Sequence, residues 1–136
     1  MNKIIKFGLI GAGAWGENYI HTIEKIKKVE LTCIYSNNLN IHKIYSHKYK
    51  IYKNWRKLIS EGIFDGLIIA TPTDTHINIM EYCINLKIPI LVEKPLTKYI
   101  YEAEKILDTA KNRGAIVLID HIHLYNPSFK KLKEIY

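Results

Sequence analysis

The sequence predicts one doubly wound α/β domain built on a mostly parallel sheet. Its 136 residues fit a single domain. Short apolar runs of strand length alternate with segments whose apolar residues recur at helical spacing. The runs contain too few polar residues for a solvated face, which is typical of parallel strands that helices cover on both sides.

Apolar runs predict five strands buried on both faces. They lie at residues 6–10, 30–35, 66–70, 90–92 and 116–119. The stretch between the second and third of these runs has weaker patterning. We expect short helices at residues 39–45 and 55–60 there, with a brief strand at residues 49–52.

Stripes of apolar residues at helical spacing predict three longer helices between the strands. The stripes are Trp15, Tyr19, Ile23 and Ile26, then Ile77, Met80 and Ile84, then Ile100, Ala103, Leu107 and Ala110. Pro72 and Asp74 precede the second helix, and Thr97 is placed to cap the third. Gly114 follows Arg113, where a left-handed residue is expected to end the third helix.

The pattern changes after Asp120. Residues 121–126 form a polar and aromatic connector, and Pro127 opens an amphipathic helix with Phe129, Leu132 and Ile135 on one stripe. We therefore divide the chain into a domain at residues 1–120 and a connector with its first helix at residues 121–136. Because an uncovered apolar stripe favours association, we also expect a homo-oligomer.

The net charge of +7 comes almost entirely from lysine, with arginine only at Arg56 and Arg113. Surfaces that read nucleic acid usually depend on arginine, so we expect no nucleic-acid partner. An AT-rich genome would also supply this much lysine, and a solvated lysine surface without a specific partner remains the alternative reading.

Neither a membrane partner nor a metal site is expected. No apolar run approaches the roughly 18 residues that a transmembrane helix needs, and the first ten residues lack the features of a signal peptide. Cys33 and Cys83 lie far apart in apolar segments, which favours two buried thiols over a disulfide or a metal site. A reducing cytoplasmic location fits these features.

A glycine-rich turn follows the first predicted strand. Gly11, Gly13 and Gly16 form the pattern G-x-G-x-x-G between that strand and the first helix. The first glycine allows a tight turn, the second lets a pyrophosphate approach the backbone, and the third lets the helix pack closely. The sequence therefore predicts a Rossmann-like dinucleotide site at Gly11, Ala12, Gly13, Ala14, Trp15 and Gly16. The alternative is a tight turn without a ligand.

The second strand ends at Ser36 and Asn37, where dinucleotide-binding folds usually place an acidic residue that binds the ribose. A neutral serine neither favours an unphosphorylated ribose nor repels a 2′-phosphate, and no arginine stands beside it to attract one. The cofactor is therefore NAD or NADP, with a slight preference for NAD. A plain turn that holds adenosine weakly is the alternative.

Ligands in open α/β sheets bind outside the carboxyl ends of the strands. Thr71, Pro72, Thr73 and His76 are the candidates that follow the apolar run at 66–70. Glu93 and Lys94 are the candidates that follow the run at 90–92. The Lys94 ammonium can hydrogen-bond a substrate hydroxyl and stabilise alkoxide character as hydride leaves carbon. Alternatively, Lys94 pairs with Glu93, and His76 caps a helix or lies on the surface.

Four segments together resemble the Gfo/Idh/MocA family, named for glucose-fructose oxidoreductase, inositol dehydrogenase and rhizopine catabolism. They are Gly-Ala-Gly-Ala-Trp-Gly at 11–16, Ala-Thr-Pro-Thr-Asp-Thr-His at 70–76, Val-Glu-Lys-Pro-Leu at 92–96 and Asp-His-Ile-His-Leu-Tyr-Asn-Pro at 120–127. The resemblance runs nearly end to end. It implies a Rossmann NAD(P)-binding domain, a following substrate domain, and hydride transfer between the cofactor and a sugar-like secondary alcohol.

The resemblance also assigns roles to particular residues. Lys94 matches the family lysine that contacts the reacting hydroxyl, and Ser36 stands where the family has its acidic ribose ligand. Residues 121–127 look most like members that act on sugars or nucleotide sugars, which makes His121 and Tyr125 substrate-side candidates. The family's second domain supplies the general base, so we expect a sugar-like substrate only where that domain is present. The alternative is a non-catalytic nucleotide-binding module or an inactive truncated homologue.

Overall fold

A computed structural model describes residues 3–135 and contains one six-stranded sheet in the order β3-β2-β1-β4-β5-β6. Every pair of neighbouring strands is parallel. The strands are β1 (Ile5–Ile10), β2 (Val29–Tyr35), β3 (Lys50–Tyr52), β4 (Gly66–Ile69), β5 (Ile90–Val92) and β6 (Val117–Ile119). The predicted doubly wound α/β fold is confirmed.

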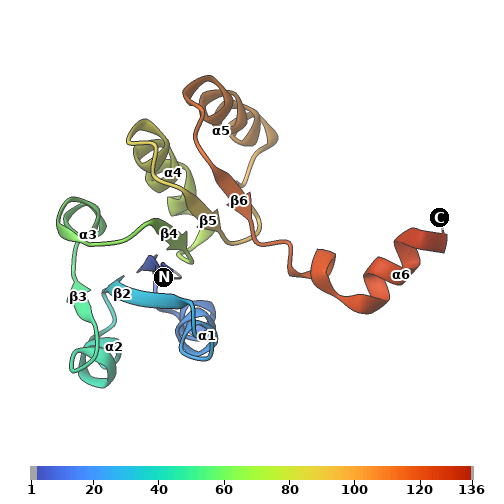
Figure 1. Ribbon diagram of the computed structural model, residues 1–136. Coiled ribbons are helices and arrows are strands. Elements are labelled where there is room, and N and C mark those ends of the chain that lie inside the picture. The colour runs from blue at the N-terminus through green and yellow to red at the C-terminus, as the bar shows by residue number, and fades with distance from the viewer. Residues whose placement is uncertain (1–2, 136) are drawn as a thin grey trace.

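Helices cover both faces of the sheet (Figure 1), with α1 and α2 on one side and α3, α4 and α5 on the other. The helices are α1 (Ala14–Ile23), α2 (Leu39–Tyr45), α3 (Trp55–Glu61), α4 (His76–Asn85), α5 (Ile100–Arg113) and α6 (Pro127–Ile135). Short 3-10 turns, η1 (Thr73–Thr75) and η2 (Ile122–Tyr125), precede α4 and α6. Within residues 3–135, no helix is both long and apolar enough to cross a membrane.

Two apolar cores hold these layers together. Fully buried Ile20 and Ile34 belong to the core on the α1 side, and Met80 and Ile106 belong to the core on the α4 side. Local signals set the element ends. Asn54 caps α3 by accepting a hydrogen bond from the Lys57 N–H at 3.1 Å. Gly114 ends α5 in the left-handed conformation, with φ of 62°, as the sequence predicts.

Two expectations about α5 are wrong. Ile100 and Leu107 are 80% and 52% exposed, whereas Ile106 and Ala110 form the buried face. Ala110 is buried as predicted, whereas Ile100 and Leu107 of the predicted stripe lie on the exposed side and Ile106 takes the core position. Thr97 is not the cap either, because the helix begins after Tyr99 and the Thr97 hydroxyl donates to the Tyr99 carbonyl oxygen at 2.9 Å.

Strand β6 is not buried on both faces as predicted. Val117 and Ile119 pack against the core that α5 completes, but Leu118 is 52% exposed. β6 is an edge strand, and its α1-side face is only partly covered. Ile26 was expected on the α1 stripe, yet it lies beyond the end of that helix and is 44% exposed.

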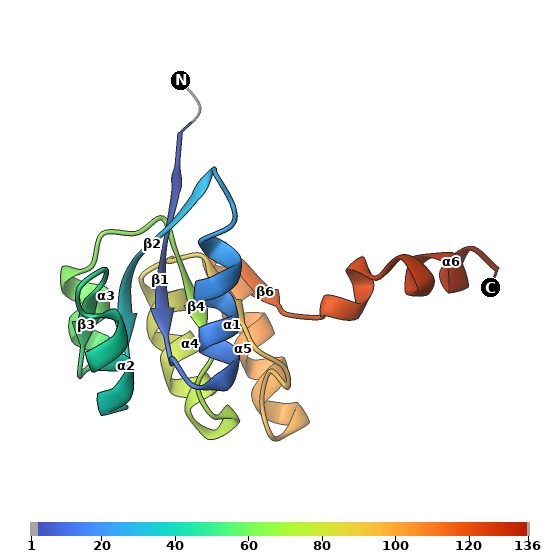
Figure 2. The ribbon, with the colours of Figure 1, turned by 90° about the horizontal axis from the view of Figure 1, so that it is seen from below.

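The last described segment projects away from the sheet (Figure 2), and the helix α6 lies well outside the layers. Phe129, Leu132 and Ile135 remain exposed along it. The position 136 at the end of the predicted helix, and residues 1 and 2 at the start of the predicted domain, lie outside the described residues.

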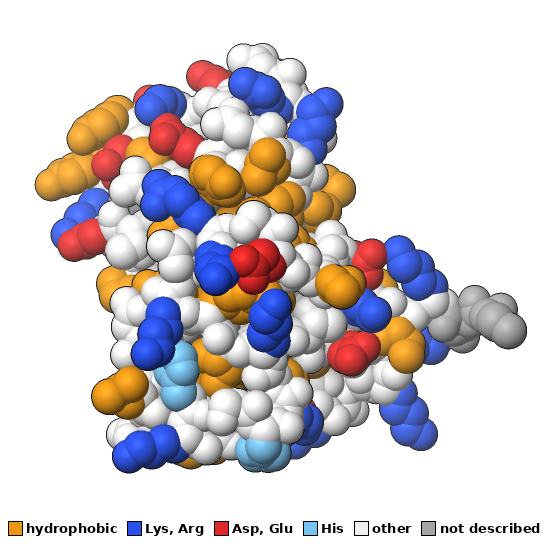
Figure 3. Space-filling model, turned by 90° about the vertical axis from the view of Figure 1, so that its left-hand side faces the viewer, with side chains coloured by type: hydrophobic (Ala, Val, Ile, Leu, Met, Phe, Trp, Pro, Cys, Tyr) orange, Lys and Arg blue, Asp and Glu red, His pale blue; other side chains and the backbone are white. Residues whose placement is uncertain are grey.

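Lysine and arginine side chains are spread over the face seen in Figure 3 among acidic, apolar and neutral groups.

Candidate functional site

The turn between β1 and α1 needs two of its glycines for the fold itself. Gly11 has φ of +101°, and a Cβ there would lie 2.6 Å from the Ala70 carbonyl oxygen. A Cβ on Gly16 would lie 2.1 Å from the Gly11 carbonyl oxygen, so a side chain at either position would force the backbone to move. These two glycines therefore let the first turn of α1 pack closely against the strand ends.

Gly13 is different, because the fold does not require a glycine there. Its φ of −77° and ψ of −165° suit any residue, and a Cβ would meet no atom within 4 Å. Gly13 is the N-cap of α1, and the N–H groups of a helix's first turn have no partners within the helix. The open space beside these N–H groups fits a pyrophosphate, which would use the donors and the positive end of the helix.

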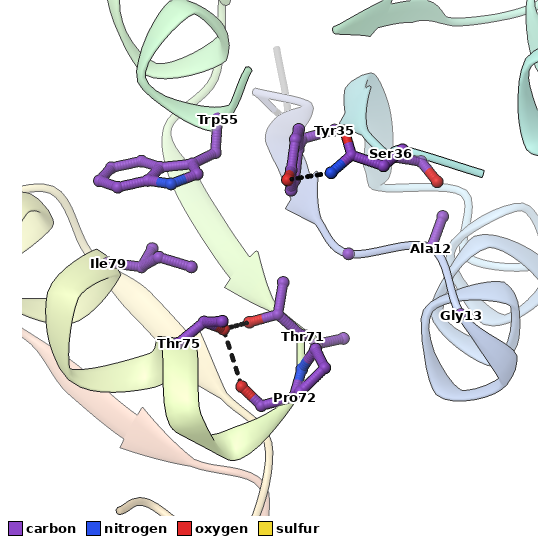
Figure 4. Close-up of a pocket in the computed structure, with 12 residues that line it drawn as sticks. Ala12, Gly13, Tyr35, Ser36, Trp55, Thr71, Pro72, Thr75 and Ile79 are labelled. Atoms are coloured by element: carbon purple, nitrogen blue, oxygen red, sulfur yellow. Dashed lines mark hydrogen bonds between the residues drawn. The ribbon is translucent and has the colours of Figure 1, made fainter. Parts of the chain in front are cut away.

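A hollow of about 370 Å³ opens beside this turn, at the carboxyl ends of β1, β2 and β4 (Figure 4). Its lining residues are Gly11, Ala12, Gly13, Tyr35, Ser36, Asn37, Trp55, Ala70, Thr71, Pro72, Thr75 and Ile79. Seven of the residues that the sequence nominated for a cofactor meet here: Gly11, Ala12, Gly13, Ser36, Asn37, Thr71 and Pro72. The seven nominated residues come from three segments that are distant in sequence.

Sequence reasoning missed the aromatic walls of this hollow. Trp55, at the start of α3, and Tyr35, at the end of β2, both line it. The Arg56 guanidinium lies 4.1 Å from the centre of the Trp55 ring, and Tyr82 meets that ring edge-on. A flat aromatic surface in a cleft suits a planar ring of a ligand. The available signal was an aromatic residue just after β3, at the start of the short helix expected at residues 55–60.

Ser36 is fixed in place and only 5% exposed. Its hydroxyl accepts a hydrogen bond from the Asn38 N–H at 3.1 Å, and its carbonyl oxygen accepts one from His42 Nε2 at 2.8 Å. Asn37 Nδ2 donates to the Tyr35 hydroxyl at 3.0 Å. No carboxylate or guanidinium is among the described residues that line this hollow.

His76 neither caps α4 nor lies on the surface, so both sequence alternatives are wrong. The turn η1 precedes α4, and the His76 side chain is 1% exposed. Its Nε2 lies 2.8 Å from the Thr71 carbonyl oxygen, and its Nδ1 lies 3.2 Å from that of Pro95. The imidazole therefore joins the loops after β4 and β5, and any role toward a cofactor is indirect. Thr73 does not line the hollow.

A second hollow, of about 450 Å³, lies beside the loop after β5. It is lined by Lys94, Pro95, Asp120, His121, Ile122, His123, Leu124 and Phe129. Lys94 is exposed there, and the Glu93 carboxylate faces Tyr19 and the Lys94 backbone N–H instead of pairing with the ammonium. His121 thus shares a hollow with Lys94, whereas Tyr125 does not line it and is 68% exposed.

The remaining nominated residues of the turn lie elsewhere. Gly16 is buried inside α1, and Ala14 does not line the first hollow. Trp15 is 51% exposed and lines a third hollow with Tyr19 and Asp120.

Both cysteines are buried free thiols, as the sequence predicts for Cys33 and Cys83. Within the described part of the chain, no group of three or more His, Cys, Asp or Glu side chains is placed to hold a metal ion.

Comparisons with known proteins agree with this geometry. A family model described as "Oxidoreductase family, NAD-binding Rossmann fold", for Gfo/Idh/MocA proteins, matches residues 5–121. The rhizopine catabolism protein MocA of Rhizobium meliloti is 29% identical over 133 residues, which are 95% of this chain and 41% of MocA. The chain therefore spans about two fifths of the length of the curated relatives that it matches.

Solved structures give the same result. Myo-inositol 2-dehydrogenase from Lactobacillus plantarum superposes with a TM-score of 0.86 at 25% identity, covering 98% of this chain and 41% of that one. The WlbA dehydrogenase from Bordetella pertussis, in complex with NADH and UDP-GlcNAcA, gives a TM-score of 0.88 at 20% identity, covering 97% of this chain and 41% of that one. At this lower identity the second likeness concerns the fold alone.

Proposed function

The chain belongs to the Gfo/Idh/MocA oxidoreductase family, as its NAD-binding domain, and from this premise we propose that it binds NAD(P) for hydride exchange with a sugar-like secondary alcohol. The observation that carries this proposal is Gly13. A glycine that the fold does not need stands at the open N-terminus of α1, beside a hollow of about 370 Å³. Its small size is explained by a ligand that approaches the backbone.

The first hollow is proposed to hold the adenosine half of the cofactor. Trp55 and Tyr35 would pack against the adenine or ribose, and Ser36 and Asn37 would hydrogen-bond the ribose hydroxyls. The described residues of this wall include neither a carboxylate to repel a 2′-phosphate nor an arginine to clamp one, so both NAD and NADP can enter. We keep the slight preference for NAD, because no cation in the wall would compensate the charge of a 2′-phosphate.

Lys94 is proposed to act at the nicotinamide end. The nicotinamide ring of NAD(P) accepts or gives the hydride when it is bound. The Lys94 ammonium would donate a hydrogen bond to the reacting hydroxyl and stabilise its developing negative charge, with His121 contacting the substrate from the same hollow. The relatives named for rhizopine catabolism and myo-inositol support a polyhydroxylated ring as the substrate class.

Calorimetric titration with NAD⁺, NADH, NADP⁺ and NADPH tests the cofactor proposal. We expect weak but measurable binding that Gly13→Asp abolishes, because the added carboxylate would occupy the phosphate position and repel it. The matched control is Asn112→Asp, which adds the same charge at an exposed position near the end of α5 and away from this hollow.

Two outcomes would contradict this proposal. Absence of binding at millimolar ligand, or binding that Gly13→Asp leaves unchanged, would remove the cofactor assignment. NADPH binding more than about tenfold tighter than NADH, a difference of about 1.4 kcal/mol, would reverse only the preference for NAD.

A further inference from the structure

Two neighbouring side chains hold Trp55 on the wall of the first hollow. The Arg56 guanidinium lies over the Trp55 ring, with its carbon 4.1 Å from the ring centre. The Tyr82 ring, from α4, stands at 85° to the Trp55 ring with 5.3 Å between the ring centres. Arg56 is exposed and, among residues 3–135, forms no ion pair with a carboxylate. Its contacts with the aromatic rings therefore hold the guanidinium in place.

These contacts leave the second face of the Trp55 ring free of both neighbours. The Arg56 guanidinium is 5.8 Å from the Tyr82 ring centre. If Tyr82 lay over the face opposite Arg56, that separation would approach the sum of the other two distances, so Tyr82 lies beside the Trp55 ring instead. Neither Arg56 nor Tyr82 lines the hollow, whereas Trp55 does. The second face is therefore the part of the ring that a flat ligand can cover.

Trp55 stands across the hollow from the glycine turn. Figure 4 shows Trp55 and Ile79 on one side of the hollow and Gly13 on the other. A nucleotide whose pyrophosphate lies at the open N-terminus of α1 would therefore carry its base toward Trp55. The indole offers a flat apolar surface on which a purine stacks.

From this geometry we propose that Arg56 is a positioning residue, which holds the Trp55 indole in one orientation so that the free face stacks on the adenine of the cofactor. The guanidinium does not touch the ligand. It keeps the indole ordered while the hollow is empty, so less freedom is lost when the base binds. That the ligand is an adenine dinucleotide rests on the proposed function, whereas the ordering of Trp55 by Arg56 does not.

Nitrogen-15 relaxation of the indole N–H groups measures this ordering without any ligand. The chain has two tryptophans, so Trp15→Phe assigns both indole signals. In Arg56→Gln the order parameter of the Trp55 signal should fall below about 0.6, the range of flexible groups, while the Trp15 signal stays unchanged. The control Lys57→Gln removes the same charge from α3 and should leave both signals unchanged. Equal order of Trp55 in Arg56→Gln and in the unmodified protein would overturn the positioning role.

Tryptophan emission tests the stacking in a Trp15→Phe background, where Trp55 is the only tryptophan. ADP contains the adenosine and the pyrophosphate of the cofactor, so it should quench the Trp55 emission to a saturating level. Inorganic pyrophosphate lacks the base and should leave the emission unchanged. Quenching by pyrophosphate equal to that by ADP would contradict stacking of the base.

Calorimetry with ADP measures what the stack contributes. Trp55→Leu should weaken ADP binding at least about fivefold, the lower end for a base stacked on an aromatic side chain. Arg56→Gln should weaken it at least about threefold through the lost ordering, and Lys57→Gln less than about twofold. Equal loss in Arg56→Gln and Lys57→Gln would contradict the inference, because loss of a positive charge would then explain both.

The outcomes separate this inference from the proposed function. If NADH binds the unmodified protein but ADP leaves the Trp55 emission unchanged, the adenine does not stack on Trp55, and this inference fails while the cofactor assignment stands. If neither NADH nor ADP binds, the cofactor assignment fails and takes the stacking with it.

Discussion

His76 Nε2 lies 2.8 Å from the Thr71 carbonyl oxygen, and this contact fastens the loop after β4 to the start of α4. On its other side, Nδ1 faces the carbonyl oxygens of Pro95 and Leu96 at 3.2 and 3.3 Å. A single buried imidazole thus packs between two loops that border the two hollows, and a neutral ring donates its one N–H to a carbonyl oxygen of one loop at a time. Its distance from solvent makes it a structural connector between the proposed adenosine and nicotinamide ends of the site.

Replacing His76 by leucine should cost about 1 to 3 kcal/mol of unfolding free energy, because buried carbonyl oxygens lose their partner. Urea unfolding measures this loss. NADH affinity should also fall, since Thr71 and Pro72 line the first hollow. The control is His47→Leu at an exposed position, which should stay within about 0.5 kcal/mol of the unmodified protein. Equal stability of the two variants would contradict the connector role.

The two cysteines should be unreactive in the folded protein. Burial raises the pKa of Cys83 to about 12, and burial also raises the pKa of Cys33 above its ordinary value. At pH 8 the reactive thiolate of Cys83 is then about one part in 10⁴. A thiol reagent should label neither residue in buffer and both in guanidinium chloride. Rapid labelling of the native protein would show that the core opens more often than the packing indicates.

The sheet was predictable from sequence because its signal is local. Strands such as residues 90–92 consist of apolar residues alone, and Gly114 stops α5 through its own backbone freedom. The buried face of α5 was not predictable to the residue. Leu107 and Ile106 are adjacent and similarly apolar, and only the packing of the helix beside α4 on the shared core decides which one is buried.

The residues of the site also divide into some that the sequence predicts and others that it does not. Gly11, Gly13 and Gly16 are recognisable because one short turn contains the whole pattern. The place of Trp55 in the hollow was not predictable from the sequence. Trp55 is brought near the glycine turn only by the parallel pairing of β3 with β2 and of β2 with β1. The buried position of His76 was not predictable for a related reason, since the carbonyl oxygens of Pro95 and Leu96 that its Nδ1 faces lie about 20 residues further along the chain.

The 136-residue chain should show no steady turnover of sugar-like alcohols by itself. Lys94 is exposed at the edge of an open hollow, and the neighbouring Leu124 and Phe129 are 47% and 37% exposed, so a ring bound there would be contacted on one side. Poor positioning of a substrate by itself removes several orders of magnitude in rate. NADH absorbance with myo-inositol, glucose or UDP-N-acetylglucosamine measures turnover.

NADH binding by the same preparation is the control, because it shows that the cofactor hollow is intact. Steady turnover that disappears in Lys94→Ala would contradict this expectation and would mean that the chain contains a complete reaction centre. Binding without turnover agrees equally with a nucleotide-binding module. The two functions then separate only when Lys94 is tested in a protein as long as the relatives.

The last prediction concerns self-association through the projecting helix. Phe129, Leu132 and Ile135 lie on one stripe of α6 and are 37%, 50% and 71% exposed. Because water disfavours such an apolar surface, we expect a second copy of the chain to cover it. Light scattering should therefore report a dimer or larger assembly.

Phe129→Asp and Leu132→Asp should each convert that assembly into a monomer, since a buried unpaired carboxylate opposes association. Lys130→Asp is the control on the side of α6 opposite the stripe; it changes the net charge of the chain more than either test variant does, but leaves the stripe intact. A monomeric unmodified protein, or an assembly that ignores both stripe substitutions, would remove α6 as the cause. If only Lys130→Asp dissociated the assembly, charge on the other side of the helix would control association instead of the apolar stripe.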